Sequence, residues 1–376
     1  MIDIKGKYNT AHVMIDQIDD TTTEQIQLMM DQPMFEGGNV AIMPDCHKGA
    51  GAVIGFTMPV NEYVIPNIIG VDIGCGVAMN IYDIKADSVD LKRFDESIHR
   101  EIPSGFNIHD DPLNIGRASF VIGLQHVCDT IGVEYHKALR AIGTLGGGNH
   151  FIELGKTEDG RVAVTVHSGS RNLGKRTADY FQNIAREELA AAGVVVPKGL
   201  EYLRSKSQSG GLYIGYLHYA QEYARYNRKA ILDIISNSIL KSDPVDHTES
   251  VHNYIDGNGI IRKGAVSAKK GERLLIPFNM RDGIAICLGK GNLEWNTSAP
   301  HGAGRILSRT QAKAKLNVEA FQEGMAAAGV YTTTANAGTL DEAPDAYKSK
   351  DVIIEAIKPT ADVLEYIKPL YNFKGC

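Results

Sequence analysis

The sequence predicts an α+β protein in which central β-sheets are flanked by helices in one continuous unit. Hydrophobic residues make up 43% of the 376 positions, and short apolar runs alternate with helical patterns along the chain. No repeat, low-complexity segment or Pro/Ser-rich linker divides the chain. At about 150 residues per domain the length would allow two or three units. Without a boundary, we expect residues 1–376 to form a single large domain.

The N-terminal third predicts helices and short strands joined by loops. Residues 20–31 begin with Thr caps followed by helix formers, and residues 35–80 alternate short Val/Ile runs with Gly, Pro and Asn. Helical patterns follow at 88–101 and 126–142. The stretch between them, residues 103–116, has no pattern and is the best candidate for a mobile surface loop.

The rest of the chain continues this mixture. Residues 161–167 alternate larger and smaller apolar side chains, which predicts a buried strand that delivers His167 at its end. An amphipathic helix is expected from there to about Ala192, and the longest helical pattern covers 212–240. Two apolar runs in 272–288 flank the sequence NMRDG, and we expect the tail from residue 310 to be mostly helical.

Composition excludes several classes of protein. The 39 Lys and Arg residues against 45 Asp and Glu give a formal charge of −6, so a uniformly basic nucleic-acid binder is excluded and any polyanion site must be local. The five cysteines are odd in number and form no CxxC pair, which favours a reducing cytoplasm. No signal peptide or apolar stretch of about 20 residues is present, so we expect no membrane partner. Without a coiled-coil pattern, a monomer is the expectation.

Two Gly-rich segments carry candidate ligands. In VDIGCGVAM (71–79), a carboxylate and a thiolate three residues apart, Asp72 and Cys75, can converge on one metal ion, and a thiolate can bridge two. The alternative is a buried Asp capping a turn beside an inert Cys. In GTLGGGNHFIEL (143–154), bare backbone beside Asn149, His150 and Glu153 suits a phosphate or nucleotide, although a Gly-rich hairpin with a hydrogen-bonded His would look the same.

Three further segments place His near basic residues. His167 ends a strand and Arg171 follows in a predicted helix N-terminus, which favours anions but is also compatible with a plain strand-to-helix cap. His252 precedes the basic stretch 262–273, which predicts either phosphate contacts or a solvated hairpin.

In APHGAGRILSR (299–309), His301 precedes glycines, and Arg305 and Arg309 are four apart, so both could share a helix face. A neutral imidazole can attack an α-phosphorus while Arg and metal stabilise the charge. A mixed O/N/S ligand set without four-Cys or HExxH spacing indicates a catalytic metal.

The motifs together resemble the RtcB-type RNA-splicing ligases, a family of GTP- and manganese-dependent enzymes. The resemblance is carried in order along nearly the whole chain by MPDCHKG (43–49), VDIGCGV (71–77), GTLGGGNHFIE (143–153), HSGSRNLG (167–174), HNY (252–254), RKGAVSA (262–268), HGAGR with SR (301–309), DEAPDAYK (341–348) and a terminal KG (374–375).

The resemblance implies an RtcB-like domain around a metal-lined cleft with two Mn²⁺ ions, held by Asp72, Cys75 as the bridging thiolate, His150, His167 and His252. It implies that His301 becomes guanylylated. Nucleotide contacts are implied for Asn149, Glu153, His301, Gly302, Ala303, Gly304, Tyr347 and Lys374, and RNA-phosphate contacts for Arg171, Arg305 and Arg309. Asp45 and His47 fall in another family motif, and we assign them no role.

The activity so implied joins RNA ends. His301 would attack GTP and release pyrophosphate; a 2′,3′-cyclic phosphate is opened to a 3′-phosphate, GMP is transferred to that phosphate, and the 5′-hydroxyl of the second RNA displaces GMP. The expected roles are tRNA splicing or RNA repair. Two alternatives stay open: the same guanylylation acting on other ends, such as DNA 3′-phosphates, or a GTP- and metal-binding accessory protein without turnover.

The chain departs from the family pattern in three places. Many members carry a GSMG stretch where this chain has NMRDG, so we expect Arg281 and Asp282 to rebuild the loop near the guanine. Cys46 occupies the variable position of the MPDxHxG motif, and we favour simple packing over a role near the metals. Cys376 extends the chain past the KG end.

Overall fold

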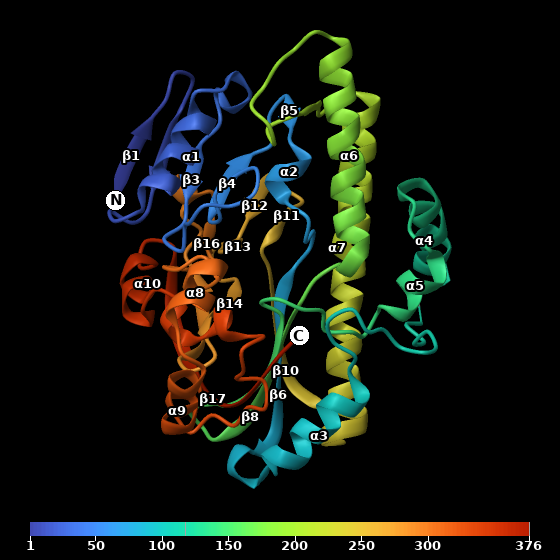
Figure 1. Cartoon of the computed structure of the whole chain (residues 1–376), viewed down its shortest axis with the longest axis vertical. Coiled ribbons are helices and arrows are strands. Elements are labelled where there is room, and N and C mark those ends of the chain that lie inside the picture. Colours follow the sequence, from blue (N-terminus) through green and yellow to red (C-terminus); the bar gives the residue numbers. More distant parts are fainter. Residues whose placement is uncertain (117, 376) are drawn as a thin grey trace.

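The computed structural model describes residues 1–116 and 118–375, and within them the predicted α+β fold is confirmed: two large β-sheets are flanked by helices (Figure 1). Cys376 lies outside the described residues. The first sheet has the strand order β1 (Ile2–Lys5), β2 (Thr10–Val13), β3 (Val40–Ile42), β4 (Phe56–Pro59), β12 (Ile260–Lys263) and β11 (Asn253–Ile255). The second has the order β10 (Pro244–Val251), β6 (Gly76–Lys85), β8 (Arg161–Ser168), β7 (Phe151–Lys156), β17 (Ala361–Lys374), β15 (Gly283–Gly289) and β14 (Arg273–Asn279).

Two short ribbons complete the strands of the described chain. They pair β13 (Ala265–Ser267) with β16 (Ser298–Pro300), and β5 (Tyr63–Val64) with β9 (Leu203–Arg204). The helices are α1 (Asp20–Met30), α2 (Pro66–Ile69), α3 (Leu91–Glu101), α4 (Ala118–Ile131), α5 (Tyr135–Arg140), α6 (Arg171–Ala191), α7 (Gln208–Ile234), α8 (Arg309–Lys315), α9 (Val318–Ala327) and α10 (Lys350–Ala356). A π-helical turn, Ile235–Leu240, continues α7. None of these helices is long and apolar enough to cross a membrane.

Strand periodicity decides which side chains of the second sheet meet the site. In β8, Val162, Val164 and Val166 join one buried cluster with the π-helical turn at the end of α7 and with α3. His167, the next residue after Val166, therefore faces the opposite side of the sheet. Tyr371 and Phe373 of β17 enter the same cluster. The alternate residues of β7, β8 and β17 therefore share one polar face at the end of the sheet.

Most predicted elements are confirmed, with three corrections. The helix expected over 126–142 begins at Ala118 and is split into α4 and α5. The tail is not helical throughout: its last part is the fourteen-residue strand β17, whose alternation of apolar and polar residues was masked by the helices before it. Arg305 lies in the loop before α8, so it shares no helix face with Arg309.

The first two cations of the basic stretch 262–273 are buried, so they belong neither to a solvated hairpin nor to an exposed phosphate-binding surface. Arg262 is fully buried, donates to Ser298 Oγ at 2.8 Å and pairs with Asp256 at 2.9 Å. Lys263 is also buried, where its ammonium donates to the backbone carbonyls of Ala50 and Asn67, and burial lowers its pKa to about 7. These two cations tie strand β12 to the neighbouring β16, to α2 and to the loop of Ala50, and the sequence could not distinguish them from surface charge.

Candidate metal and nucleotide site

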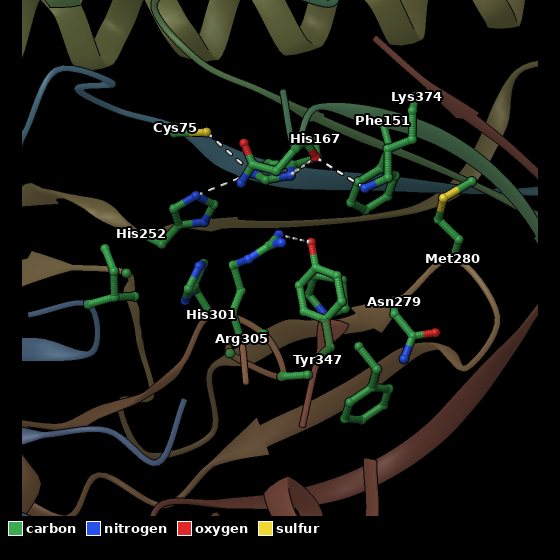
Figure 2. Close-up of a pocket in the computed structure, with 18 of the residues that line it drawn as sticks. Cys75, Phe151, His167, His252, Asn279, Met280, His301, Arg305, Tyr347 and Lys374 are labelled. Carbon is green, nitrogen blue, oxygen red and sulfur yellow. Dashed lines mark hydrogen bonds between the residues drawn. The ribbon is translucent and has the colours of Figure 1, made fainter. Parts of the chain in front are cut away.

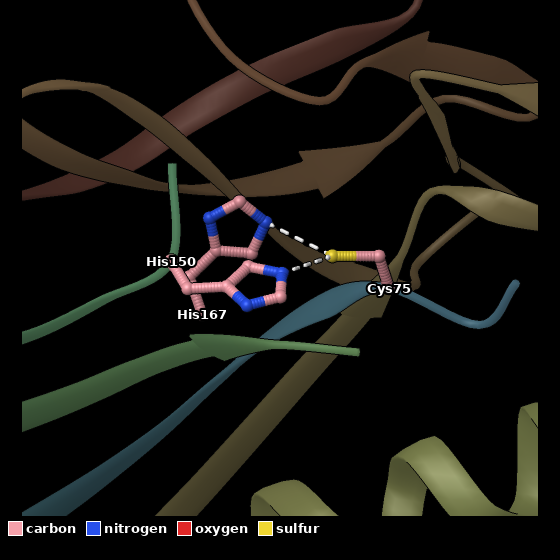
Figure 3. Close-up of side chains that lie close together, drawn as sticks. All are labelled: Cys75, His150 and His167. Atoms are coloured by element: carbon pink, nitrogen blue, oxygen red, sulfur yellow. Dashed lines mark hydrogen bonds between the residues drawn. The ribbon is translucent and has the colours of Figure 1, made fainter. Parts of the chain in front are cut away.

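Five residues predicted as metal ligands meet in space, and we call them the ligand cluster: Asp72, Cys75, His150, His167 and His252. Cys75 Sγ lies 3.4 Å from His150 Nε2 and 3.3 Å from His167 Nε2 (Figure 3). Asp72 Oδ2 lies 3.0 Å from His150 Nε2, and the Nε2 atoms of His167 and His252 are 3.3 Å apart. Residues 177 positions apart, from Cys75 to His252, thus form one continuous cluster.

The backbone fixes the tautomer of two imidazoles in the cluster. His150 Nδ1 donates to the carbonyl of Leu145 at 2.9 Å, and His167 Nδ1 donates to the carbonyl of Asn149 at 3.1 Å. Because a carbonyl only accepts, both Nδ1 atoms carry a proton, so in the neutral form of each ring the lone pair is on Nε2, which faces Cys75. Burial holds the pKa of His167 well below its ordinary value, which keeps its imidazole neutral.

These donors fit a divalent metal. The ligand atoms of Cys75, His150 and His167 all lie within 4.8 Å of one another, and the two unprotonated Nε2 atoms converge on the sulfur. One sulfur and two imidazole nitrogens at this spacing are a donor set that a divalent cation can bind together. Burial and the Asp72 carboxylate raise the pKa of the Cys75 thiol well above its ordinary value, so a thiolate at Cys75 would depend on the charge of a bound metal.

A buried arginine that the sequence analysis missed supports the loop of Asp72 and Cys75. The Arg228 guanidinium, from α7, donates to the carbonyls of Gly74 at 2.7 Å and Ser168 at 2.9 Å, and pairs with Glu249 at 2.8 Å. It therefore ties the loop of Cys75 to the end of strand β8. No sequence signal singled out Arg228, because it lies inside an ordinary helical pattern.

His301 lies beside the cluster and is held by a residue to which we had assigned no role. Its Nδ1 donates to Asp45 Oδ2 at 2.5 Å, and its backbone N–H donates to the same oxygen at 3.2 Å. Asp45 is fully buried, and the His301 and His252 rings have centroids 4.7 Å apart. The proton on Nδ1 leaves the lone pair of His301 on Nε2. The MPDCHKG motif was the signal for Asp45, but spacing alone could not pair it with a residue 256 positions away.

A cavity of about 290 Å³ joins these groups (Figure 2). Every predicted site residue lines it except His150 and Arg171, the latter of which lines a neighbouring cavity. Gly302, Ala303 and Gly304 form its wall next to His301. Gly304 has φ +71°, and a Cβ there would lie 2.2 Å from the carbonyl oxygen of Asp45, so only glycine lets the two segments meet.

Arg305, Arg309 and Lys374 converge on a carboxylate that the sequence analysis did not single out. Glu342 is buried and pairs with Arg305 at 3.2 Å, Arg309 at 2.8 Å and Lys374 at 3.3 Å. The Tyr347 hydroxyl donates to the same carboxylate at 2.6 Å. Although burial opposes ionisation, these cations lower the pKa of Glu342 and keep it charged. This network fixes three cations along the cavity wall.

A polar row crosses the sheet at the other end of the cavity. Glu153 of β7 is paired in register with Thr165 of β8 and with Asn372 of β17, whose Nδ2 donates to Glu153 Oε2 at 2.9 Å. One buried side-chain oxygen in each of the three residues has no protein partner. Glu153, Asn372 and Lys374 all line the cavity. Buried acceptors without partners indicate a ligand with hydrogen-bond donors.

The NMRDG turn contributes different residues from those expected. Asn279 and Met280 line the cavity, at the end away from the ligand cluster (Figure 2). Arg281 instead pairs with Asp282 at 3.1 Å and with Asp345 at 3.4 Å, outside this cavity. Cys46 packs in the hydrophobic core, as predicted.

The environment of Glu153 predicts a pH-dependent stability. Burial raises its pKa to about 8, despite opposing contributions from Asn372 and Lys374, against 4.5 in the unfolded chain. Between these values the folded state holds a proton that the unfolded state has released, so the free energy of unfolding falls as pH rises through this window. In metal-free protein, the melting temperature of the Glu153→Gln variant should therefore fall less between pH 5 and pH 8 than that of the wild type. Parallel melting curves of the two proteins across that range would contradict this assignment.

The fold and the site together define a class: a protein with a candidate metal site whose O/N/S donor set and adjacent carboxylate-held imidazole are typical of a catalytic rather than a structural centre. The family described as tRNA-splicing ligase RtcB matches this chain over residues 25–129 and 129–375. The chain belongs to the RtcB family.

Named relatives align with this chain over most of their length. RNA-splicing ligase RtcB of Escherichia coli K12 is 29% identical over 377 residues, which cover 90% of each chain. tRNA-splicing ligase RtcB of Aeropyrum pernix is 27% identical and covers 88% of each chain. RNA-splicing ligase RtcB of Mycobacterium tuberculosis is 28% identical over 84% of this chain and 91% of its own.

Proposed function

We propose that this protein is a GTP- and Mn²⁺-dependent RNA ligase that joins 2′,3′-cyclic phosphate or 3′-phosphate ends to 5′-hydroxyl ends in tRNA splicing or RNA repair. The observation that carries the proposal is His301: its Nδ1–H is held by Asp45, and its ring packs against His252 of the ligand cluster in the same cavity. We further propose that residues 1–376 act as one domain.

In this proposal His301 Nε2 attacks the α-phosphorus of GTP. The new P–N bond replaces the P–O bond to pyrophosphate, which leaves. Two divalent ions, held by Asp72, Cys75, His150, His167 and His252, would supply charge stabilisation at the phosphates. The His301 ring keeps its Nδ1 proton and donates it in a hydrogen bond to Asp45. The Asp45 carboxylate stabilises the positive charge that develops on the ring, as the carboxylate does in a catalytic triad.

The polar row gives the nucleotide pocket a preference for guanine over adenine. A guanine base carries an N1–H, an exocyclic amino group and a carbonyl on one edge. The partnerless oxygen of Asn372 suits one donor, Glu153 suits the other once binding releases its proton, and the Lys374 ammonium suits the carbonyl. Adenine presents an unprotonated N1 at this edge and would leave one of these acceptors without a donor. Asn149 and Tyr347 border the same cavity, between the base and the phosphates.

Next, the activated GMP passes to an RNA 3′-phosphate. A cyclic phosphate is first opened by water to a 3′-phosphate, which attacks the guanylylated His301 and breaks the P–N bond. The 5′-hydroxyl of the second RNA then displaces GMP. Arg305 and Arg309 line the cavity with their charge partly compensated by Glu342, a position suited to the 3′-phosphate.

Ligation of defined ends tests the proposal. The protein is incubated with GTP, Mn²⁺ and one oligonucleotide with a 3′-phosphate and one with a 5′-hydroxyl, as RNA or as DNA. We expect joined RNA that depends on GTP and on manganese. A joined or capped DNA product with unreacted RNA would favour the second candidate enzyme. GTP binding without covalent adduct or product would favour an accessory protein.

A further inference from the structure

A second cavity of about 740 Å³ lies next to the first. It is formed by the segment between α3 and α4, by α5, by Gly147 and Gly148, and by the beginning of α6. In Figure 1 the segment between α3 and α4 runs across the α6–α7 pair toward α5. The proposed guanylylation uses no residue of this cavity, although Arg171 was expected to contact RNA.

The charge of the second cavity is positive. Lys137, Arg171 and Lys175 line it, and no Asp or Glu does. Lys175 also pairs with Asp179 on the same helix at 2.7 Å, but both side chains are exposed, so this pair is weak. In a chain with a formal charge of −6, three cations without a carboxylate in the same hollow indicate a polyanionic ligand.

Phe106 is the second notable feature of this cavity. Its ring is fully exposed, with a relative accessibility of 104%, while the apolar side chains of Ile108, Val133 and Ala138 lie on the same cavity wall. An exposed Phe contributes nothing to the core, and both faces of its ring are available for contact. An aromatic ring above an apolar wall with cations around it is the combination that binds single-stranded nucleic acid by stacking on a base.

A single glycine lies between Arg171 of the second cavity and the ligand cluster. A Cβ on Gly146 would lie 2.1 Å from Arg171 Nη1 and 2.5 Å from His150 Nδ1, so its bare backbone separates a guanidinium of the second cavity from an imidazole of the ligand cluster. The Gly146 carbonyl accepts from Gly105, next to Phe106, at 2.9 Å, and Arg171 Nη2 donates to the Gly105 carbonyl at 2.6 Å. The second cavity therefore lies one layer of backbone away from the ligand cluster, with Arg171 on one side of Gly146 and His150 on the other.

Arg171 is held in place at a cost in backbone energy. It has φ +54° at the start of α6, a conformation that a residue with a side chain rarely adopts. Its Nε donates to Thr144 Oγ1 at 3.0 Å, so with the Gly105 contact the guanidinium is fixed between the two cavities. Such strain is typical of residues positioned for a ligand.

We propose that the second cavity binds the RNA strand next to its reacting end, with Phe106 stacked on a base and Lys137 and Arg171 contacting the flanking phosphates. This inference rests on the proposed function, because it takes the ligand to be RNA that reacts at the ligand cluster. The pairing of one ring with a few phosphate contacts makes the subsite tolerant of base sequence.

The test compares Phe106→Leu and Phe106→Trp with wild-type protein. Binding is measured by fluorescence anisotropy with two single-stranded RNA oligonucleotides, one ending in a 3′-phosphate and one beginning with a 5′-hydroxyl. Stacking on one base is worth about 1–3 kcal/mol, so Phe106→Leu should weaken binding of at least one oligonucleotide about 5- to 150-fold. Phe106→Trp should bind as wild type does, and its fluorescence should be quenched by RNA. Lys137→Gln should lower the dependence of binding on salt concentration.

Leu293→Ala is the matched control, since Leu293 is 80% exposed and lies outside both cavities. Covalent labelling by GTP alone reports the catalytic site separately, because it requires no RNA. If Phe106→Leu binds both oligonucleotides as tightly as wild type does, the subsite is contradicted, even when ligation occurs. If wild-type protein fails to be labelled but Phe106→Leu still weakens RNA binding, the subsite stands and the proposed ligase chemistry fails.

Discussion

Cys75→Ala should abolish ligation and lower Mn²⁺ affinity by more than 100-fold. Cys75 Sγ lies 3.3–3.4 Å from two imidazole nitrogens that keep their lone pairs, so the sulfur is the centre of the cluster. Changes to residues that merely support a metal ligand already cost about 10–100-fold in affinity or activity, and loss of a ligand should cost more. Metal analysis after dialysis against Mn²⁺, together with the ligation assay, measures both effects.

Cys287→Ala provides the matched control for this prediction. Cys287 is also a fully buried free thiol, but it packs in a hydrophobic cluster of β14, β15 and α10. The Cys287→Ala substitution should lower the free energy of unfolding somewhat and leave the amount of bound manganese unchanged. Full metal content and ligation in Cys75→Ala would show that the thiol is only a small buried side chain.

Asp45→Asn should slow guanylylation by about 10⁴-fold while the protein keeps its metal. The carboxylate accepts the Nδ1 proton of His301, whereas an amide can present its N–H there and force the proton onto Nε2, which must be the nucleophile. The magnitude is taken from the corresponding Asp-to-Asn change in a serine-protease triad. Rapid-quench measurement of label transfer from GTP gives the rate.

Stability and metal content separate a role in orienting His301 from a structural one. A structural defect would lower the rate at every pH and lower the melting temperature, whereas a wrong tautomer lowers the rate in a protein with near-normal stability and metal content. Asp19→Asn, a change in an exposed helix cap that does not line the cavity, is a control of the same chemistry. A wild-type labelling rate in Asp45→Asn would contradict the orienting role.

Sequence patterns predicted the elements whose periodicity is local. Strand β8 and the long helices α6 and α7 were predicted because their apolar spacing is regular over many residues. Strand β17 was missed, since its alternating residues follow three helices and its pairing with β7 and β15 joins segments more than 70 residues apart. Arg262 and Lys263 were misread because burial of a charge depends on partners that local sequence does not show.

The candidate site divides in a similar way. Residues in Gly-rich motifs, such as Cys75, His150 and His301, stood out by their neighbours and are brought together by the fold. Glu342 and Arg228 carry no such signal, because their importance lies in the charges and carbonyls around them. Asn372 was hidden in a strand that the sequence analysis did not predict, so the polar row could not be anticipated.

The central claim is that His301 is a nucleophile served by the metal cluster beside it, and the most direct measurement is the location of a covalent adduct. Protein exposed to GTP and Mn²⁺ is digested under non-acidic conditions, which preserve a P–N bond, and its peptides are analysed by mass spectrometry. The account predicts GMP on the peptide that contains His301, at the imidazole, and none in His301→Ala or after removal of metal. GMP on another residue, or no adduct on protein that contains its metal, would contradict it.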